Sequence, residues 1–202
     1  MDGTENDIFL RGSLVELPEF SHENHGKRFY RFYLEVARLS GTADILPVIA
    51  PEDAVMALDP CAGSMLAVRG QIRSHNLTEQ GRRKLMVFVF AREVCAEDGE
   101  PENQVNLSGV LCREPVYRKT PLGREICDVM LALPRAFHRA DYLPCILWGR
   151  TARECARTPV GGRLTIQGRL QSRRYCKQTP EGAQERITYE VSALTAQTEP
   201  PF

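Results

Sequence analysis

Long hydrophobic runs and a basic, apolar leader are both missing from this sequence, and each absence excludes a class of protein. No stretch of about 18 consecutive apolar residues occurs in the 202 residues, so no transmembrane helix is expected. The first residues, Met1-Asp2-Gly3-Thr4-Glu5, are acidic and polar, which does not fit a secretory signal. We therefore expect a cytoplasmic protein without a membrane partner.

Paired cysteines are missing as well, although the chain contains seven cysteines. They stand singly, with no C-x-x-C pair, and their number is odd, which argues against a disulfide framework and a structural zinc site. His22 and His25 lie close together, but no second Cys or His pair stands at zinc-finger spacing. We expect reduced, mostly buried thiols, no metal and no cofactor.

Catalytic signatures are also absent, because no nucleophile with a base, paired acids, metal cluster or phosphate loop is convincing. Gly161-Gly162 precedes a predicted strand rather than a helix, which predicts a turn and not a phosphate cradle. Asp44 and Asp141 each stand just before a predicted strand, where a capping or turn role is expected. We expect a protein that is not an enzyme.

The sequence does contain an internal repeat. Residues 43–49 (ADILPVI) match residues 140–146 (ADYLPCI) at five of seven positions, with a spacing of 97. Two further pairs, Gly70 with Gly168 and Ser74 with Ser172, match after a one-residue shift. Six more pairs match at a spacing of 97: Asn6 with Asn103, Leu10 with Leu107, Gly12 with Gly109, Leu14 with Leu111, Pro18 with Pro115, and Gly26 with Gly123. The repeat predicts two domains.

The boundary between the two copies is predicted at residues 96–102. This stretch has four acidic residues, a glycine and a proline and no apolar periodicity, which is typical of a solvated linker. We therefore expect a diverged first domain over 1–95, the acidic linker over 96–102, a second domain over 103–195 and a short C-terminal tail over 196–202. Domains of this size bury only modest cores.

The formal net charge of zero hides an asymmetry between the halves. Residues 1–98 contain 11 Lys and Arg against 15 Asp and Glu, whereas residues 99–202 contain 15 against 11. A basic domain joined to an acidic one suggests that the second half meets a polyanion. Ordinary scatter of surface charge is the alternative interpretation.

Alternation of apolar and polar residues, with an apolar run over 142–148, predicts the strands of the second half, and the first half repeats the same plan. In the second half we expect strands over 105–111, 127–133, 142–148, 163–172 and about 186–194, with a short helix over 151–157. In the first half we expect strands near 8–15, 28–36, 45–50, 64–74 and 84–92. Five strands with a helix between the third and fourth is the order of an OB-fold, which often binds oligonucleotides. The predicted fold is all-β with short helices, as two tandem five-stranded OB-fold barrels.

The second half also resembles the bacterial single-stranded DNA-binding protein family over residues 103 to about 193. Five motifs in order carry the resemblance: the opening Asn103-Gln104-Val105-Asn106-Leu107-Ser108-Gly109-Val110-Leu111; Glu114-Pro115-Val116-Tyr117-Arg118 with Pro121 and Gly123; Ile146-Leu147-Trp148-Gly149; Gly168-Arg169-Leu170-Gln171-Ser172-Arg173-Arg174-Tyr175; and Tyr189-Glu190-Val191. The resemblance implies a non-catalytic protein that binds and protects single-stranded DNA in replication, recombination or repair, in the nucleoid.

The resemblance also implies which residues bind DNA. In the family, aromatic side chains stack on bases, and base stacking tolerates any sequence. The matching aromatic positions are Trp148, Tyr175 and Tyr142, with Phe137 as a looser match because the loop between strands two and three is shorter. Basic residues that would follow the phosphates are Arg118, Lys119, Arg124, Arg173, Arg174 and Lys177.

The first half lacks the base-stacking aromatic residues at the aligned positions, since Pro51, Leu77 and Ile45 replace Trp148, Tyr175 and Tyr142. One stripe, Phe29, Arg31 and Tyr33, alternates with Tyr30, Phe32 and Leu34, so one of the two sets must face away from the core. The stripe Phe29, Arg31 and Tyr33 is a possible second surface, for bases or for a contact between barrels. We favour the contact between barrels.

Partners are predicted by analogy with the same family. Four OB-folds in one particle are common there, so a two-barrel chain is expected to form a homodimer. Thr198-Glu199-Pro200-Pro201-Phe202 resembles the acidic tip that recruits replication and repair proteins, with Pro201 and Phe202 as its end; an ordinary polar terminus is the alternative. Two other functions stay open: a restart factor like primosomal replication protein N, which has a stretch similar to residues 107–113, and an OB-fold structural or protein-interaction module.

Overall fold

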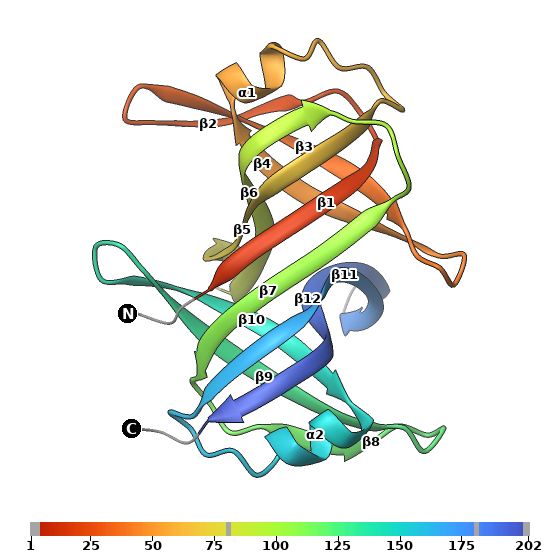
Figure 1. Ribbon diagram of the computed structural model, residues 1–202, viewed down its shortest axis with the longest axis vertical. Coiled ribbons are helices and arrows are strands. Elements are labelled where there is room, and N and C mark those ends of the chain that lie inside the picture. Colours follow the sequence, from red (N-terminus) through yellow and green to blue (C-terminus); the bar gives the residue numbers. More distant parts are fainter. Residues whose placement is uncertain (1–4, 80–81, 180–181, 200–202) are drawn as a thin grey trace.

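The computed structural model describes residues 5–79, 82–179 and 182–199. They form twelve strands and two short helices, and the strands join in one continuous sheet (Figure 1). The elements are β1 (Asn6–Leu14), β2 (Glu19–Asn24), β3 (Lys27–Ala37), β4 (Ala43–Pro51), α1 (Glu52–Met56), β5 (Met65–Glu79), β6 (Arg82–Ala96), β7 (Glu102–Leu111), β8 (Val116–Lys119), β9 (Glu125–Arg135), β10 (Arg139–Trp148), α2 (Gly149–Cys155), β11 (Arg163–Thr179) and β12 (Gly182–Glu199).

The sheet closes into two barrels, β1 to β6 and β7 to β12. Each barrel closes through the same two contacts: the first strand pairs antiparallel with the third, and the fourth pairs parallel with the sixth. Alternation places Leu131 and Leu133 of β9 in the core of the second barrel, and Phe32 and Leu34 of β3 in that of the first. The predicted all-β fold of two OB barrels is confirmed. Each barrel also has a short edge strand that was not predicted, β2 or β8, hydrogen-bonded to the strand that follows it.

The two barrels are joined by antiparallel pairing of β1 with β7. In this pairing Asn6 lies opposite Leu107, and Leu10 lies opposite Asn103. Because Asn6 aligns with Asn103 and Leu10 with Leu107 in the repeat, the pairing relates the barrels by an approximate two-fold axis. The contact is therefore made by the same surface of each copy.

The repeated asparagines and glycines have structural reasons. The Asn6 side chain donates to the carbonyl of Ile72 at 2.8 Å and accepts from its N–H at 2.9 Å, and Asn103 does the same with Leu170, at 2.7 and 3.0 Å. A Cβ at Gly168 would lie 2.2 Å from the carbonyl oxygen of Ser192, so no larger residue fits there. These pairs position the long hairpins on the barrels.

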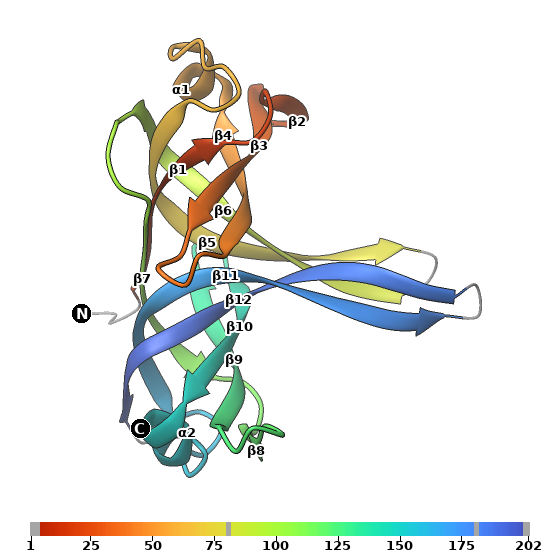
Figure 2. The same cartoon turned by 90° about the vertical axis from the view of Figure 1, so that its right-hand side faces the viewer.

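Two long hairpins, β5–β6 and β11–β12, project from the same side of the molecule (Figure 2). The last strand was predicted to end near Leu194, but β12 continues to Glu199, which pairs with Arg163 at the start of β11. Residues 196–199 therefore belong to the strand and not to a tail, because pairing with β11 continues where the apolar alternation stops. Pro201 and Phe202 lie outside the described residues.

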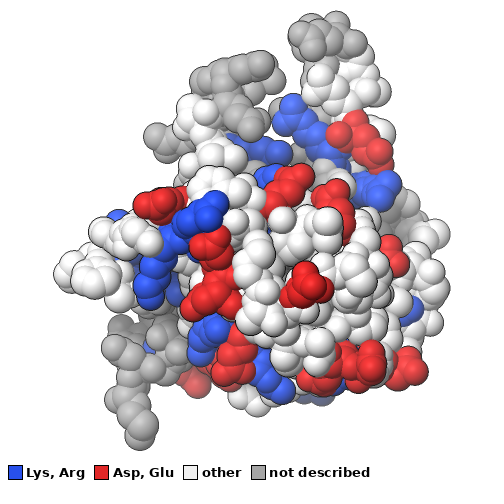
Figure 3. All heavy atoms as spheres, turned by 90° about the horizontal axis from the view of Figure 1, so that it is seen from above, with Lys and Arg blue, Asp and Glu red and all other residues white. Residues whose placement is uncertain are grey.

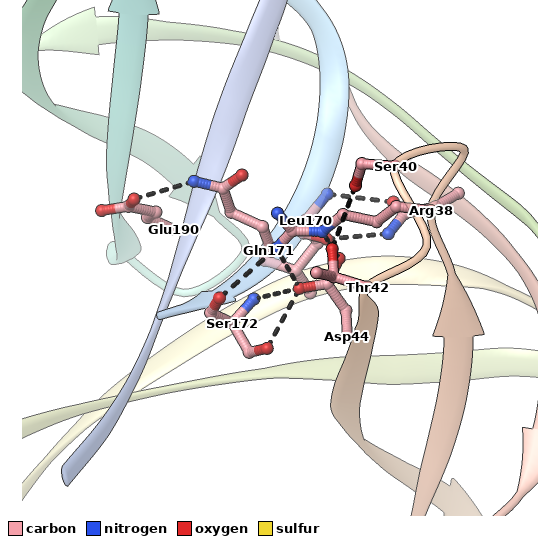
Figure 4. A network of polar contacts seen from close by, with 9 residues as sticks. Arg38, Ser40, Thr42, Asp44, Leu170, Gln171, Ser172 and Glu190 are labelled. Atoms are coloured by element: carbon pink, nitrogen blue, oxygen red, sulfur yellow. Dashed lines mark hydrogen bonds and ion pairs between the residues drawn. The ribbon is translucent and has the colours of Figure 1, made fainter. Parts of the chain in front are cut away.

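Polar side chains bridge the barrels on both sides of the β1–β7 pairing. The carboxylate of Asp141 accepts a hydrogen bond from the Ser74 backbone at 2.8 Å, and Asp44 accepts one from the Ser172 backbone at 2.7 Å (Figure 4). Asp44 and Asp141 were predicted to be capping or turn residues, and that prediction is wrong. Each aspartate instead holds the hairpin of the other barrel.

These contacts determine the ionisation state of the Asp44 carboxylate. Burial opposes ionisation, but the Arg38 guanidinium, which donates two hydrogen bonds to the carboxylate, and the Ser172 N–H outweigh it and hold the pKa of Asp44 below its usual range. The Asp44 side chain is 1% exposed. The carboxylate is therefore charged at neutral pH although it is buried.

The cysteines are less buried than predicted. Cys127, Cys145 and Cys155 are buried in the second barrel, whereas Cys61, Cys95, Cys112 and Cys176 are exposed free thiols. The prediction of mostly buried thiols is wrong, because the exposed four lie on loops, strand ends or outward-facing positions. Within the ranges that the structure describes, no helix has the length and apolar character needed to cross a membrane.

Candidate nucleic-acid interface

Trp148 ends β10 and forms part of the outer surface of the second barrel. Its indole N–H donates to the hydroxyl of Ser192 on β12 at 3.0 Å, and 37% of the residue remains exposed. Leu147, its neighbour in the chain, is fully buried, as alternation along the strand requires. The hydrogen bond fixes the ring while part of it stays accessible.

Tyr142 lies on the same outer side of β10, six residues before Trp148, and is 44% exposed. Six residues of strand correspond to roughly 20 Å, a distance that several nucleotides span. The Tyr142 backbone N–H donates to the hydroxyl of Ser74 in the first barrel at 2.8 Å. Tyr142 therefore stands where the outer face of the second barrel meets the first.

Tyr175 lies on β11 within the projecting hairpin and is 42% exposed. Arg173, two residues earlier, lies on the same face of the strand, while Arg174 lies on the opposite face. Both arginines have loose ionic partners, Glu190 and Glu185, each at 3.8 Å. Lys177 is on the same strand, but its side chain is outside the described part of the structure.

The other predicted basic residues gather on the β8–β9 hairpin. Arg118 and Lys119 are on β8, and Arg124 lies in the turn that follows. Arg118 forms an ion pair with Asp128 of β9 at 2.9 Å, which reduces its free charge. The structure therefore places the ten predicted residues in separate groups on the second barrel: the outer side of β10, the long hairpin, the β8–β9 hairpin and the β9–β10 turn.

Phe137 is at the tip of the β9–β10 turn and is 90% exposed. Its φ angle is +61° and that of His138 is +54°, in the left-handed region that bulky residues rarely adopt. The turn presents an aromatic ring to solvent in a strained backbone conformation. A residue in such a conformation is a candidate for function.

The stripe Phe29, Arg31 and Tyr33 faces away from the core, as alternation requires, but it is not uniformly exposed. His22 stacks on Phe29, with ring centroids 4.9 Å apart, and Phe90 covers it from another side, so Phe29 is buried. Phe29 is therefore not available as a surface residue, because the rings of His22 and Phe90 cover it on the outer face of the barrel.

Arg31 and Tyr33 line a groove of about 670 Å³ between the first barrel and the hairpin of the second. The Arg31 guanidinium lies 6.0 Å from the Tyr33 ring centroid, and Tyr189 of β12 lines the same groove. Burial, with a smaller contribution from Tyr33, raises the pKa of Tyr189 to about 12. Arg31 and Tyr33 thus face the hairpin of the other barrel across an open groove, whereas Phe29 does not line it.

The sequence prediction missed a group of arginines at the junction between the barrels. Arg73 of β5 and Arg135 of β9 contact the buried carboxylate of Asp141 at 3.2 and 3.3 Å. Only folding brings them together, although a comparison of the repeats offered a signal: Arg73 aligns with Gln171, while Arg135 aligns with Arg38. At the far end of the first barrel, basic and acidic side chains are interspersed and form no single patch (Figure 3).

Comparison with known protein families assigns the second barrel. The model of the single-strand binding protein family matches residues 102–198. Single-stranded DNA-binding protein B of Bacillus subtilis (strain 168) is 38% identical over 100 residues, covering 46% of this chain and 86% of that protein. Single-stranded DNA-binding protein A of the same organism is 35% identical over 102 residues, covering 47% of this chain and 58% of that protein.

Comparison with solved structures covers both barrels. The wild-type single-stranded DNA binding protein from Thermus aquaticus superposes with a TM-score of 0.78, over 98% of this chain and 94% of that chain. The sequence identity is 24%. This likeness shows that the tandem fold extends over the first barrel as well.

Proposed function

The chain belongs to the single-strand binding protein family, and we propose that it binds and protects single-stranded DNA in replication, recombination or repair without catalysing a reaction. The observation that carries the proposal is the exposure of Trp148, Tyr142 and Tyr175 on the outer surface of the second barrel, each 37 to 44% exposed. Exposed aromatic rings on a barrel that also presents basic residues are the features that single-strand binding requires.

In the proposed mechanism, bases stack on the aromatic rings while arginines contact the phosphates. Arg173 shares a strand face with Tyr175, so a base on the ring would have its phosphate near a guanidinium. Ser192 restrains the indole of Trp148 before DNA arrives, so that less side-chain freedom is lost on binding. Stacking and charge contacts recognise no particular base, which agrees with binding to single-stranded DNA of any sequence.

Trp148 provides the test because it is the only tryptophan. An oligothymidine strand stacked on the indole should quench its fluorescence at low salt. Trp148→Ala should weaken binding, measured by anisotropy of labelled DNA, by roughly 1 to 3 kcal/mol. Leu39→Ala, at a fully exposed residue of the β3–β4 turn, is the matched control and should bind as the native chain does.

Salt gives a second readout for the same proposal. The logarithm of the binding constant should fall with the logarithm of salt concentration by about 0.7 per phosphate contacted. Unchanged fluorescence together with no shift of labelled DNA would refute the proposed function.

Assembly and recruitment are further parts of the proposal. We propose that two chains form a homodimer with four barrels, and that Pro201 and Phe202 contact replication or repair proteins. Sedimentation should give twice the mass of one 22.8 kDa chain. Deletion of residues 200–202 should leave DNA affinity intact and abolish capture of a partner; capture that survives the deletion contradicts the role of the tail.

A further inference from the structure

A cavity of about 760 Å³ lies at the junction of the two barrels, apart from the aromatic residues of β10 and β11. It is lined by the β2–β3 turn and β5 of the first barrel and by the β9–β10 turn of the second. The two turns point to the same side of the molecule (Figure 1). Residues with polar or aromatic side chains in the lining include Asn24, His25, Arg73, Arg135, Phe137 and Arg139.

The cavity carries a surplus of positive charge. Arg73 and Arg135 share a single carboxylate, that of Asp141, which is 0% exposed. Burial, together with the charge of Arg135, lowers the pKa of Arg73. The two guanidinium groups face one carboxylate, so the group has a surplus of positive charge. Arg139 is exposed and has no ionic partner among the described residues. An anion placed between these groups would relieve the repulsion.

The other side of the two-fold axis shows that this surplus is not needed to join the barrels. There Asp44 bridges to Ser172 with a single arginine, Arg38, which donates two hydrogen bonds to it (Figure 4). Gln171 takes the position of Arg73 and bonds to Glu190 at 2.9 Å. Thr42 and Ser40 take the positions of Arg139 and Phe137. The same bridge forms without the added arginines.

We propose that the junction cavity binds a phosphate of a DNA strand that passes from the second barrel to the first, with a neighbouring base stacked on Phe137. This inference rests on the proposed function. The donors are the guanidinium groups of Arg135 and Arg139, whose planar geometry matches phosphate oxygens. The cavity is lined by both barrels, so a strand held there is held by the two copies together.

The test compares a short oligothymidine of about 8 nucleotides, which one barrel accommodates, with a long one of about 30, which spans both. Arg139→Gln should weaken binding of the long strand several-fold, lower its salt slope by about 0.7 and leave the short strand unaffected. Arg135→Gln, which removes the other proposed donor, should do the same. Arg157→Gln, at an exposed arginine beyond α2, is the matched control.

Each outcome distinguishes the two proposals. If the native chain binds neither strand, the proposed function fails and the inference fails with it. If the native chain binds both strands and Arg139→Gln has the salt slope of Arg157→Gln, the inference alone is overturned. If thymidine 5′-monophosphate alone raises the melting temperature of the native chain but not of Arg139→Gln, while long-strand affinity is unchanged, the cavity is a free-nucleotide site and the strand route is wrong.

Discussion

Asp44 of the first barrel accepts a hydrogen bond from the backbone nitrogen of Ser172 in the second barrel, at 2.7 Å, and another from the Ser172 hydroxyl, at 3.0 Å. Its counterpart in the repeat, Asp141, accepts one from the backbone of Ser74. The two copies therefore exchange equivalent contacts. Residues that recur in both halves therefore hold the halves together.

Removing the carboxylate of Asp44 should destabilise the chain. Asp44→Ala leaves the Arg38 guanidinium and the Ser172 N–H without their partner in a buried site, at a cost of about 3 kcal/mol in the free energy of unfolding. Urea denaturation followed by circular dichroism measures the change. Asp7→Ala, which breaks an exposed ion pair with Arg92 of 2.9 Å, is the control and should cost less than about 1 kcal/mol. Equal losses in the two variants would contradict the bridging role.

The contribution of Asp44 should depend on pH in a defined direction. Its pKa is lower in the folded chain than in the unfolded chain, so the stabilisation is complete above the ordinary aspartate value of about 3.9. It is lost as the pH falls through the lower folded pKa, because the carboxylate is then protonated. The difference in unfolding free energy between the native chain and Asp44→Asn should be constant from pH 7 to 5 and shrink below pH 4. If the difference in unfolding free energy between the native chain and Asp44→Asn grew on acidification, the pKa of Asp44 would not be lowered in the folded chain.

Replacing Phe137 should improve stability and impair binding. Phe137→Gly relieves the strain of the left-handed backbone at φ +61°, which should raise the free energy of unfolding by about 1 kcal/mol. The same substitution removes the ring on which a base is proposed to stack. Thermal melting and anisotropy of labelled DNA measure the two effects. His138→Gly, at φ +54°, is the control, because it relieves a similar strain and keeps the Phe137 ring. Full DNA affinity in Phe137→Gly would remove Phe137 from the proposed surface.

The seven cysteines should divide into two classes by reactivity. Iodoacetamide should label Cys61, Cys95, Cys112 and Cys176 in the folded chain, and Cys127, Cys145 and Cys155 only after unfolding. Burial raises the pKa of Cys145, and a hydrogen bond with the Cys127 thiol together with burial raises that of Cys155, so both remain unreactive thiols. Peptide mass spectrometry measures how far each cysteine has been labelled. Labelling of Cys145 in the native chain at the rate of Cys61 would contradict the division into two classes.

Local sequence patterns were sufficient for most strands of the barrels, whereas the candidate aromatic residues were predicted from the family resemblance. Alternation predicted the buried Leu131 and Leu133 of β9, and Trp148, Tyr142 and Tyr175 are exposed at outward-facing positions of their strands, although Ile146, which has the same parity as Trp148, is buried. Periodicity did not predict what covers an outward residue. Phe29 has the outward parity but is buried, because His22 and Phe90 reach it from other strands.

The sequence by itself determined the all-β class, the two copies and five of the six strands of each barrel, because alternation and repetition are properties of neighbouring residues and of aligned positions. Only the tertiary structure decided how the copies meet. The hydrogen bond between Asp44 and Ser172 joins residues 128 positions apart, and that between Ser74 and Asp141 joins residues 67 apart. Such contacts depend on the register of β1 against β7, which places the hairpin of one barrel beside the turns of the other. The same register brings Arg73 to Arg135, and with them the basic cavity that neither copy contains alone.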